Sequence, residues 1–217
     1  MKYKAIIFDL DGVICHTDNY HYLAWKELAN QLDIYFDREI NNRLRGVSRM
    51  ESLEIILERY KGNPLSDQAK TQYAEEKNNI YKVLLEKMSP EDLSDEVKQT
   101  LDDLREKGLK MAIGSSSKNA PFILKQIGLE GYFDAISDGN NITYSKPDPE
   151  VFIKASNYLG ISPKDCLVIE DAEAGVDAAI AGGMDSAAIG DAVKCNRATY
   201  NLTTFSDILN IVHKTNE

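Results

Sequence analysis

The ten residues KAIIFDLDGV, at positions 4–13, set the interpretation of the whole chain. The apolar run at 5–8 is short and is typical of a strand that is buried on both faces. Two carboxylates, Asp9 and Asp11, follow at once, and Gly12 then allows a sharp turn. Paired acids after a buried strand are costly to fold, because close carboxylates repel each other and lose their hydration. The stretch therefore favours a site for a hard cation such as Mg2+, with one acid as nucleophile and the other as general acid or base.

The composition is that of an ordinary globular chain, with 217 residues, 43% hydrophobic and 28% charged. This length allows one good core, or a core and a small accessory domain. The net charge of -10 argues against a nucleic-acid partner, so an anionic ligand needs a locally basic pocket or a metal. No segment approaches the ~20 apolar residues of a membrane span, so we expect no membrane partner. The widely spaced Cys15, Cys166 and Cys195 fit reduced thiols in a cytoplasmic protein.

Residues 19–88 show helical periodicity and almost no strand signal. Leu28 and Leu32 continue one apolar stripe, and Leu53 and Leu57 begin another. A long polar helix is expected to run from Ser66, which can act as its N-cap, to Met88. Together these patterns predict a helical insert of roughly seventy residues, which is enough for a small bundle.

The remainder of the chain alternates helices and strands. Strands are expected at 5–8, 109–114, 133–137, 166–171 and 185–190, and helices at 94–107, 119–128, 149–160, 173–181 and near 207–214. Such alternation predicts an α/β fold with a Rossmann-like, doubly wound parallel sheet. Because the first strand belongs to that sheet, we expect a discontinuous core of residues 1–15 and 89–217. The helical-bundle cap, residues 16–88, is then inserted after the first strand.

Polar residues stand where several of the predicted strands end. Asp9 and Asp11 follow the first strand, serines at 115–117 follow the second, and the acids at 170–171 close the fourth. Lys146 lies in the loop SKPDPE, before a helix opened by proline. Because ligands collect at the carboxyl ends of parallel strands, we expect these side chains to converge on one edge of the sheet.

Each of these residues has a use in phosphoryl transfer. Asp9 can attack phosphorus in line and form an aspartyl-phosphate, and Asp11 can deliver or remove the proton of the hydroxyl partner. The acids at 170–171 offer, with Asp9, oxygen ligands for Mg2+. Ser115 and nearby amides can bind phosphoryl oxygens, and Lys146 can offset their negative charge.

Four ordered motifs, FDLDG, the SSS after the second strand, SKPDPE and VIEDAEAG, resemble those of the haloacid dehalogenase superfamily of phosphotransferases. The insert after the first motif is similar to the helical cap of that superfamily. The segments NYHYLAWKELA, RGVSRMESL and GSSSKNAPFIL further resemble the β-phosphoglucomutase family. That resemblance implies interconversion of β-glucose 1-phosphate and glucose 6-phosphate through β-glucose 1,6-bisphosphate. Hexose phosphates and bisphosphates are therefore the expected partners, and Mg2+ the expected cofactor.

The resemblance also implies roles for the matched core residues. Asp9 would be the nucleophile and Asp11 the general acid/base, while Ser115 and Lys146 would hold the transferring phosphoryl group. The Mg2+ ligands would be Asp9, the backbone carbonyl of Asp11, Glu170 and Asp171.

The cap and the loop that faces it would bind the rest of the substrate. By the same resemblance, Arg49 would hold the second phosphate of the substrate, and His21 and Lys77 would couple substrate binding to closure. The other implied substrate-binding residues are Trp25, Gly46, Val47, Ser48, Ser116, Ser117, Lys118 and Asn119. Such a cap is stabilised in its closed position only by a two-ended substrate, and closure keeps water from the aspartyl-phosphate.

Other interpretations of the chain stay open at this point. The same core could act as a sugar-phosphate phosphatase, with water as the acceptor, or as a phosphosugar-binding protein without turnover. A closing cap on a small core is compatible with a monomer.

Individual residues also have simpler explanations. The acids at 170–171 could cap a helix, and Arg49 could be a surface charge. His21 with Trp25 could be a packing pair, and Lys77 could pair with acids along its own helix. His16 stands where the resembled family usually has an acid, so the charge of the loop after the first motif differs from that of the family.

Overall fold

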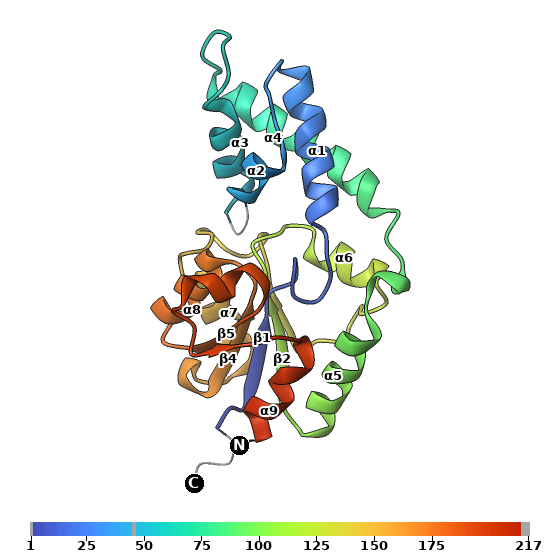
Figure 1. Ribbon diagram of the computed structural model, residues 1–217, viewed down its shortest axis with the longest axis vertical. Coiled ribbons are helices and arrows are strands. Elements are labelled where there is room, and N and C mark those ends of the chain that lie inside the picture. The colour runs from blue at the N-terminus through green and yellow to red at the C-terminus, as the bar shows by residue number, and fades with distance from the viewer. Residues whose placement is uncertain (1, 45–46, 214–217) are drawn as a thin grey trace.

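The computed structural model describes residues 2–44 and 47–213, and Figure 1 shows its arrangement. The opening strand β1 (Ala5–Phe8) lies in the middle of a parallel sheet. It pairs on one side with β2 (Lys110–Gly114) and on the other with β4 (Cys166–Glu170). All four residues of β1 are buried, as expected for a strand that is covered on both faces.

The sheet is completed by β3 (Ala135–Ser137), β5 (Asp185–Ala188) and β6 (Tyr200–Asn201). Among the described residues the strand order is β3-β2-β1-β4-β5-β6, and all pairs are parallel. This is the strand order of a Rossmann-type sheet, in which successive strands are added on one side of β1 and then, from β4, on its other side. The predicted α/β, doubly wound fold is confirmed.

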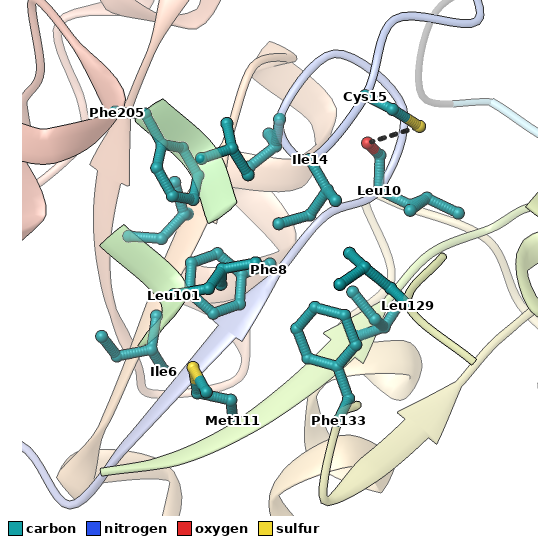
Figure 2. Packing of buried hydrophobic residues seen from close by; sticks show 14 of the residues in the cluster. Ile6, Phe8, Leu10, Ile14, Cys15, Leu101, Met111, Leu129, Phe133 and Phe205 are labelled. Carbon is teal, nitrogen blue, oxygen red and sulfur yellow. Dashed lines mark hydrogen bonds between the residues drawn. The ribbon is translucent and has the colours of Figure 1, made fainter. Parts of the chain in front are cut away.

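Helices cover both faces of the sheet because alternate side chains of each strand point to opposite faces. On one face, Ile6 and Phe8 pack in a cluster with side chains from α5 (Asp95–Glu106), α6 (Ala120–Gln126) and α9 (Ile208–His213). Figure 2 shows Phe8 in this cluster, with ring centroids 5.7 Å from Phe205 and 6.2 Å from Phe133. On the other face, Ala5 and Ile7 pack with α7 (Glu150–Leu159) and α8 (Glu173–Ala181).

The predicted core elements are present, with shifted ends. The strand expected at 185–190 stops at Ala188, because Gly190 adopts a positive φ of 60° and opens a 3-10 helix, Gly190–Cys195. The helix expected near 207–214 begins at Ile208 after a 3-10 turn, Phe205–Asp207, and position 214 lies outside the described residues. Strand β6 was not predicted, since two residues carry no periodic signal. Short 3-10 turns also occur at Pro90–Asp92 and Pro163–Asp165.

The segment between β1 and α5 is helical, as predicted. Its helices are α1 (Asp18–Gln31), α2 (Arg38–Asn42), α3 (Arg49–Leu57) and α4 (Asp67–Leu85). In Figure 1 these helices form a group at one end of the molecule, apart from the sheet.

The helical group has its own buried cluster, which includes Trp25, Leu28, Leu53 and Ile56. Ser66 caps α4 as expected, since its side chain accepts a hydrogen bond from the amide of Ala69. Helix α4 ends at Leu85, three residues before the predicted Met88. The exact division between core and cap, after residues 15 and 88, stays a prediction.

In the part of the chain that the structure describes, no helix combines the length and the apolar character that crossing a membrane requires.

We expect Phe8→Ala to lower the free energy of unfolding by about 3–5 kcal/mol, because it opens a cavity between Phe133 and Phe205. Urea denaturation followed by circular dichroism would measure this loss. Tyr158→Ala removes an aromatic ring that is 54% exposed, so it should change the stability by less than about 0.5 kcal/mol. Equal effects of the two substitutions would contradict the packing described here.

Candidate active site

Three carboxylates meet where β1 and β4 end. Asp9 directly follows β1, Glu170 is the last residue of β4, and Asp171 comes next. All three residues are buried, and their carboxylate oxygens can lie within 4.8 Å of one another. The parallel pairing of β1 with β4 brings these acids together although about 160 residues separate them, as the strand-end rule predicted.

The donor set of this cluster suits a hard divalent cation, since it consists of buried carboxylate oxygens. Two glycines leave the space that these carboxylates occupy. A Cβ on Gly175 would stand 1.7 Å from Glu170 Oε1, and a Cβ on Gly12 would stand 2.1 Å from Asp171 Oδ2. Burial, together with the charge of Asp9, holds the pKa of Glu170 well above its ordinary value. A cation at the cluster would relieve this cost.

Lys146 supplies part of the balancing charge. Its Nζ lies 2.5 Å from Asp9 Oδ1 and 3.3 Å from Glu170 Oε1, and its side chain is 1% exposed. Burial alone would lower the pKa of Lys146, but the charges of Asp9 and Glu170 raise it above its ordinary value. The lysine is therefore a fixed cation that faces the first acid of the FDLDG motif.

Asp11 stands apart from the three-acid cluster and has a different partner. The hydroxyl of the buried Thr17 donates a hydrogen bond to its Oδ1. Desolvation, followed by the charge of Asp9, raises the pKa of Asp11 to about 7. A carboxyl of this kind can hold or release a proton near neutral pH, which is the property that a general acid/base requires.

The serine-rich segment after β2 forms a compact loop at the same edge. The Ser117 amide donates to Ser115 Oγ over 3.1 Å, and the Asn119 amide donates to Ser117 Oγ over 3.2 Å. The Ser115 amide itself donates to the carbonyl of Ser137, at the end of β3. These bonds fix the loop at 115–119 beside Asp9 and Lys146, where its polar groups line the same cavity.

The helical group contributes a buried aromatic and basic cluster. Lys77 Nζ lies 2.9 Å from His21 Nδ1, above the rings of Trp25 and Tyr81 at 4.7 Å and 4.5 Å from their centroids. The ring of Tyr81 stacks on His21 at 4.1 Å. Lys77 is thus buried against His21 instead of lying along α4, which contradicts an ion pair within its own helix.

Burial lowers the pKa values of the basic side chains in this cluster. Desolvation, followed by the positive charges of Lys77 and Arg49, keeps the pKa of His21 well below its ordinary value. Desolvation and Arg49 likewise lower the pKa of Lys77. A neutral His21 can accept a hydrogen bond at Nδ1 from Lys77, and Arg49 is a further basic side chain of this part of the cavity.

One cavity of about 670 Å³ joins the two halves of the site. It lies between the carboxyl edge of the sheet and the helical group, and every predicted site residue that the structure describes lines it. These residues are Asp9, Asp11, His21, Trp25, Val47, Ser48, Arg49, Lys77, Ser115, Ser116, Ser117, Lys118, Asn119, Lys146, Glu170 and Asp171. The remaining predicted residue, Gly46, lies outside the described residues. The individual roles assigned to these residues stay predictions.

Some residues of the site were not predicted. Tyr81 lines the cavity one helical turn after Lys77, a spacing that the sequence already contained. Asn78 and Thr17 are further cases, and no periodic signal distinguishes them from ordinary polar residues. His16, which departs from the resembled family, is exposed and does not appear among the described residues that line the cavity.

Comparison with known proteins agrees with this geometry. A family model described as haloacid dehalogenase-like hydrolase matches residues 3–183. A β-phosphoglucomutase of Bacillus subtilis (strain 168) is 42% identical over 214 residues, which cover 97% of this chain and 94% of that protein. The fructose-1-phosphate phosphatase YqaB of Escherichia coli (strain K12) is 31% identical over 186 residues, or 85% of this chain and 95% of that protein.

Solved structures give the same relationship. A crystal structure of a β-phosphoglucomutase from Clostridium difficile superimposes with a TM-score of 0.88 at 36% sequence identity. The match covers 95% of this chain and 93% of that one, so it includes the helical group as well as the sheet.

We expect Gly175→Ala to weaken the binding of a divalent cation by at least about tenfold, because the new Cβ displaces the carboxylate of Glu170. Calorimetric titration with Mg2+ and the paramagnetic signal of Mn2+ would both measure this effect. Gly182→Ala is the matched control, since it makes the same change at the end of the same helix without meeting a carboxylate. Unchanged cation affinity in Gly175→Ala would contradict the assignment of the three acids as ligands.

Proposed function

The chain belongs to the haloacid dehalogenase-like hydrolase family, and from this premise we propose that it is a Mg2+-dependent β-phosphoglucomutase. It interconverts β-glucose 1-phosphate and glucose 6-phosphate through an aspartyl-phosphate and β-glucose 1,6-bisphosphate. The observation that carries the proposal is the cavity of about 670 Å³. It places the acids of the sheet edge opposite Arg49, at the start of α3 in the helical group. A cavity with an acidic reaction centre and a second, basic end suits a sugar that carries two phosphates.

Asp9 is the nucleophile of the proposed reaction. Its Oδ1 contacts Lys146, whose positive charge offsets the negative charge of an approaching phosphoryl group. An Asp9 oxygen attacks phosphorus in line, the bond to the leaving oxygen of the bisphosphate breaks, and an aspartyl-phosphate with a hexose monophosphate results. The aspartyl-phosphate then gives its phosphoryl group to the free 6-hydroxyl of β-glucose 1-phosphate, which forms the bisphosphate again. When this bisphosphate gives its 1-phosphoryl group to Asp9, glucose 6-phosphate leaves and the cycle is complete.

Asp11 handles the proton in both directions. It protonates the sugar oxygen that leaves as Asp9 is phosphorylated, and it removes the proton of the hydroxyl that later takes the phosphoryl group back. A pKa of about 7 suits this alternation, and the hydrogen bond from Thr17 holds the carboxyl in place.

Mg2+ is the proposed cation of the acidic cluster, and when bound it neutralises negative charge on the transferring phosphoryl group. Asp9, Glu170 and Asp171 would hold it, with the backbone carbonyl of Asp11 as the further predicted ligand. Ser115 and the amides of its loop bind the phosphoryl oxygens on the other side.

The helical group selects a two-ended substrate and excludes water. Arg49, with Ser117, Lys118 and Asn119 across the cavity, holds the phosphate that is not being transferred. Binding at both ends draws the cap against the core, which keeps water from hydrolysing the aspartyl-phosphate. The paired His21 and Lys77 occupy the cap side of the same cavity and bind the sugar between the phosphates.

A sugar-phosphate phosphatase is the second candidate, and the likeness to a fructose-1-phosphate phosphatase favours it. It would use the same core residues and differ only in the acceptor. The higher identity to a β-phosphoglucomutase, over nearly the whole of both chains, supports the mutase instead.

Product analysis separates the two candidates. The protein is incubated with β-glucose 1-phosphate, Mg2+ and a small amount of hexose bisphosphate as primer, and glucose 6-phosphate is followed against free phosphate. We expect glucose 6-phosphate as the main product and no turnover in Asp9→Asn, which lacks the nucleophile. Rapid release of phosphate without the isomer would exclude the mutase, and turnover by Asp9→Asn within about tenfold of wild type would exclude Asp9 as nucleophile.

Arg49→Ala should impair isomerisation far more than hydrolysis of the one-ended p-nitrophenyl phosphate, because only the bisphosphate uses the basic end of the cavity. The loss in kcat/KM should be about 100-fold for isomerisation, the cost of a charge-assisted bidentate contact. Arg43→Ala is the matched control, since Arg43 is exposed, pairs with Glu58 and is not among the described residues that line the cavity. Equal losses for the two substrates of Arg49→Ala would remove its assigned role.

A further inference from the structure

One hydrogen bond links the helical group to the serine-rich loop. The side-chain amide of Asn119 donates to Asn78 Oδ1 over 2.9 Å. Asn78 lies on α4, directly after Lys77, and both asparagines line the cavity. Among the described residues, this is the hydrogen bond that joins helices α1–α4 to the loop at 115–119.

The side chain of Asn119 makes this contact and does not cap its own helix. It occupies the N-cap position of α6, where an asparagine side chain ordinarily accepts a hydrogen bond from the first turn of its own helix. Here it makes no such bond, and its side chain is buried and directed to Asn78 instead. The local stabilisation of α6 is therefore exchanged for a contact across the boundary between cap and core.

The loop is connected to this contact at one end and to the sheet at the other. The Asn119 amide bonds to Ser117 Oγ, and the side-chain amide of Asn140 donates to the carbonyl of Lys118 over 2.9 Å. Ser115, in contrast, is held by the carbonyl of Ser137 in β3. A change in the position of α4 would therefore act on the part of the loop near Asn119, while Ser115 keeps its place in the core.

A second set of contacts between α4 and the core lies farther from the cavity. The side-chain amide of Gln126 is 3.4 Å from the carbonyls of Leu85, Glu86 and Met88, at the end of α4. Asn78 is about two helical turns before this point, so small rotations about the end of α4 move it more than they move Leu85.

We infer that Asn78 is a positioning residue, which holds the amide of Asn119 and so sets the phosphate-binding loop at 115–119 according to the position of the cap. The inference rests on the proposed function, because that function assigns the loop to the second phosphate of the substrate. Asn78 acts through Asn119 and contributes to binding of a two-ended hexose phosphate, with little influence on the chemistry at Asp9.

The test compares two substrates in Asn78→Ala. For β-glucose 1-phosphate with bisphosphate primer, total turnover is measured as isomer plus free phosphate, and kcat/KM should fall about tenfold, chiefly through KM. For p-nitrophenyl phosphate, which does not reach the loop near Asn119, the fall should stay below about threefold. Asn79→Ala is the matched control, since Asn79 is the next residue of α4 and is exposed. Asn79→Ala should leave kcat/KM for both substrates unchanged.

A double-mutant cycle shows whether Asn78 acts through Asn119. If it does, adding Asn78→Ala to the Asn119→Ala variant should lower kcat/KM for the two-ended substrate by less than a further factor of about two. Independent, multiplying losses would assign Asn78 to the substrate itself and overturn the positioning role. Equal losses for both substrates, with a lowered melting temperature, would make Asn78 merely structural, and an unaffected Asn78→Ala would also refute the inference.

Failure of this inference is distinguishable from failure of the proposed function. If wild-type protein releases phosphate without forming glucose 6-phosphate, the mutase is excluded. The losses in kcat/KM that Asn78→Ala causes for the two substrates can still be compared, because total turnover includes hydrolysis. That comparison still tests the positioning role.

Discussion

The accumulation of buried negative charge where β1 and β4 end is the constraint on which the rest of the structure depends. Asp9, Glu170 and Asp171 are buried side by side, and an isolated group of this kind would strongly oppose folding. Lys146 offsets part of the charge, and the glycines at 12 and 175 leave room for the carboxylates. Buried carboxylates beside a lysine suit a divalent cation and a phosphoryl group, and this supports phosphoryl transfer as the chemistry of the chain.

The two sides of the cavity are built from different kinds of secondary structure. The core side is built on strand ends, whose positions are fixed by sheet register, and this suits attack at a defined distance. The cap side is built on helices joined to the core through residues near 15–17 and 86–89, and burial lowers the pKa values of its His21 and Lys77. In the proposed function, the strand-end side supports the reaction and the helical side distinguishes one substrate from another.

Sequence patterns predicted the features of this molecule that depend on interactions between residues close together in the chain. The strands expected at 5–8 and 166–171 follow from apolar runs, and the second of them ends one residue earlier, at Glu170. Ser66 begins α4 because its hydroxyl accepts a hydrogen bond from a free amide. The acids of the site followed from the rule for parallel strand ends, whereas the cap residues came from family resemblance alone. Strand β6 was not predicted, because two residues are too few to show a periodic pattern. The place of Tyr81 in the site was not predicted either, because its position on the helix resembles ordinary helix packing.

By itself, the sequence determined the alternation of helices and strands, the place of the helical insert and the chemistry available at each strand end. Only the tertiary structure decided which side chains meet. Lys146 reaches Asp9 across 137 residues, Lys77 reaches His21 across 56, and Asn119 reaches Asn78 across 41. The physical reason is one of range. Backbone propensity and capping act within one or two turns, but the distance between remote side chains is set by how apolar faces pack, and that depends on the whole chain at once.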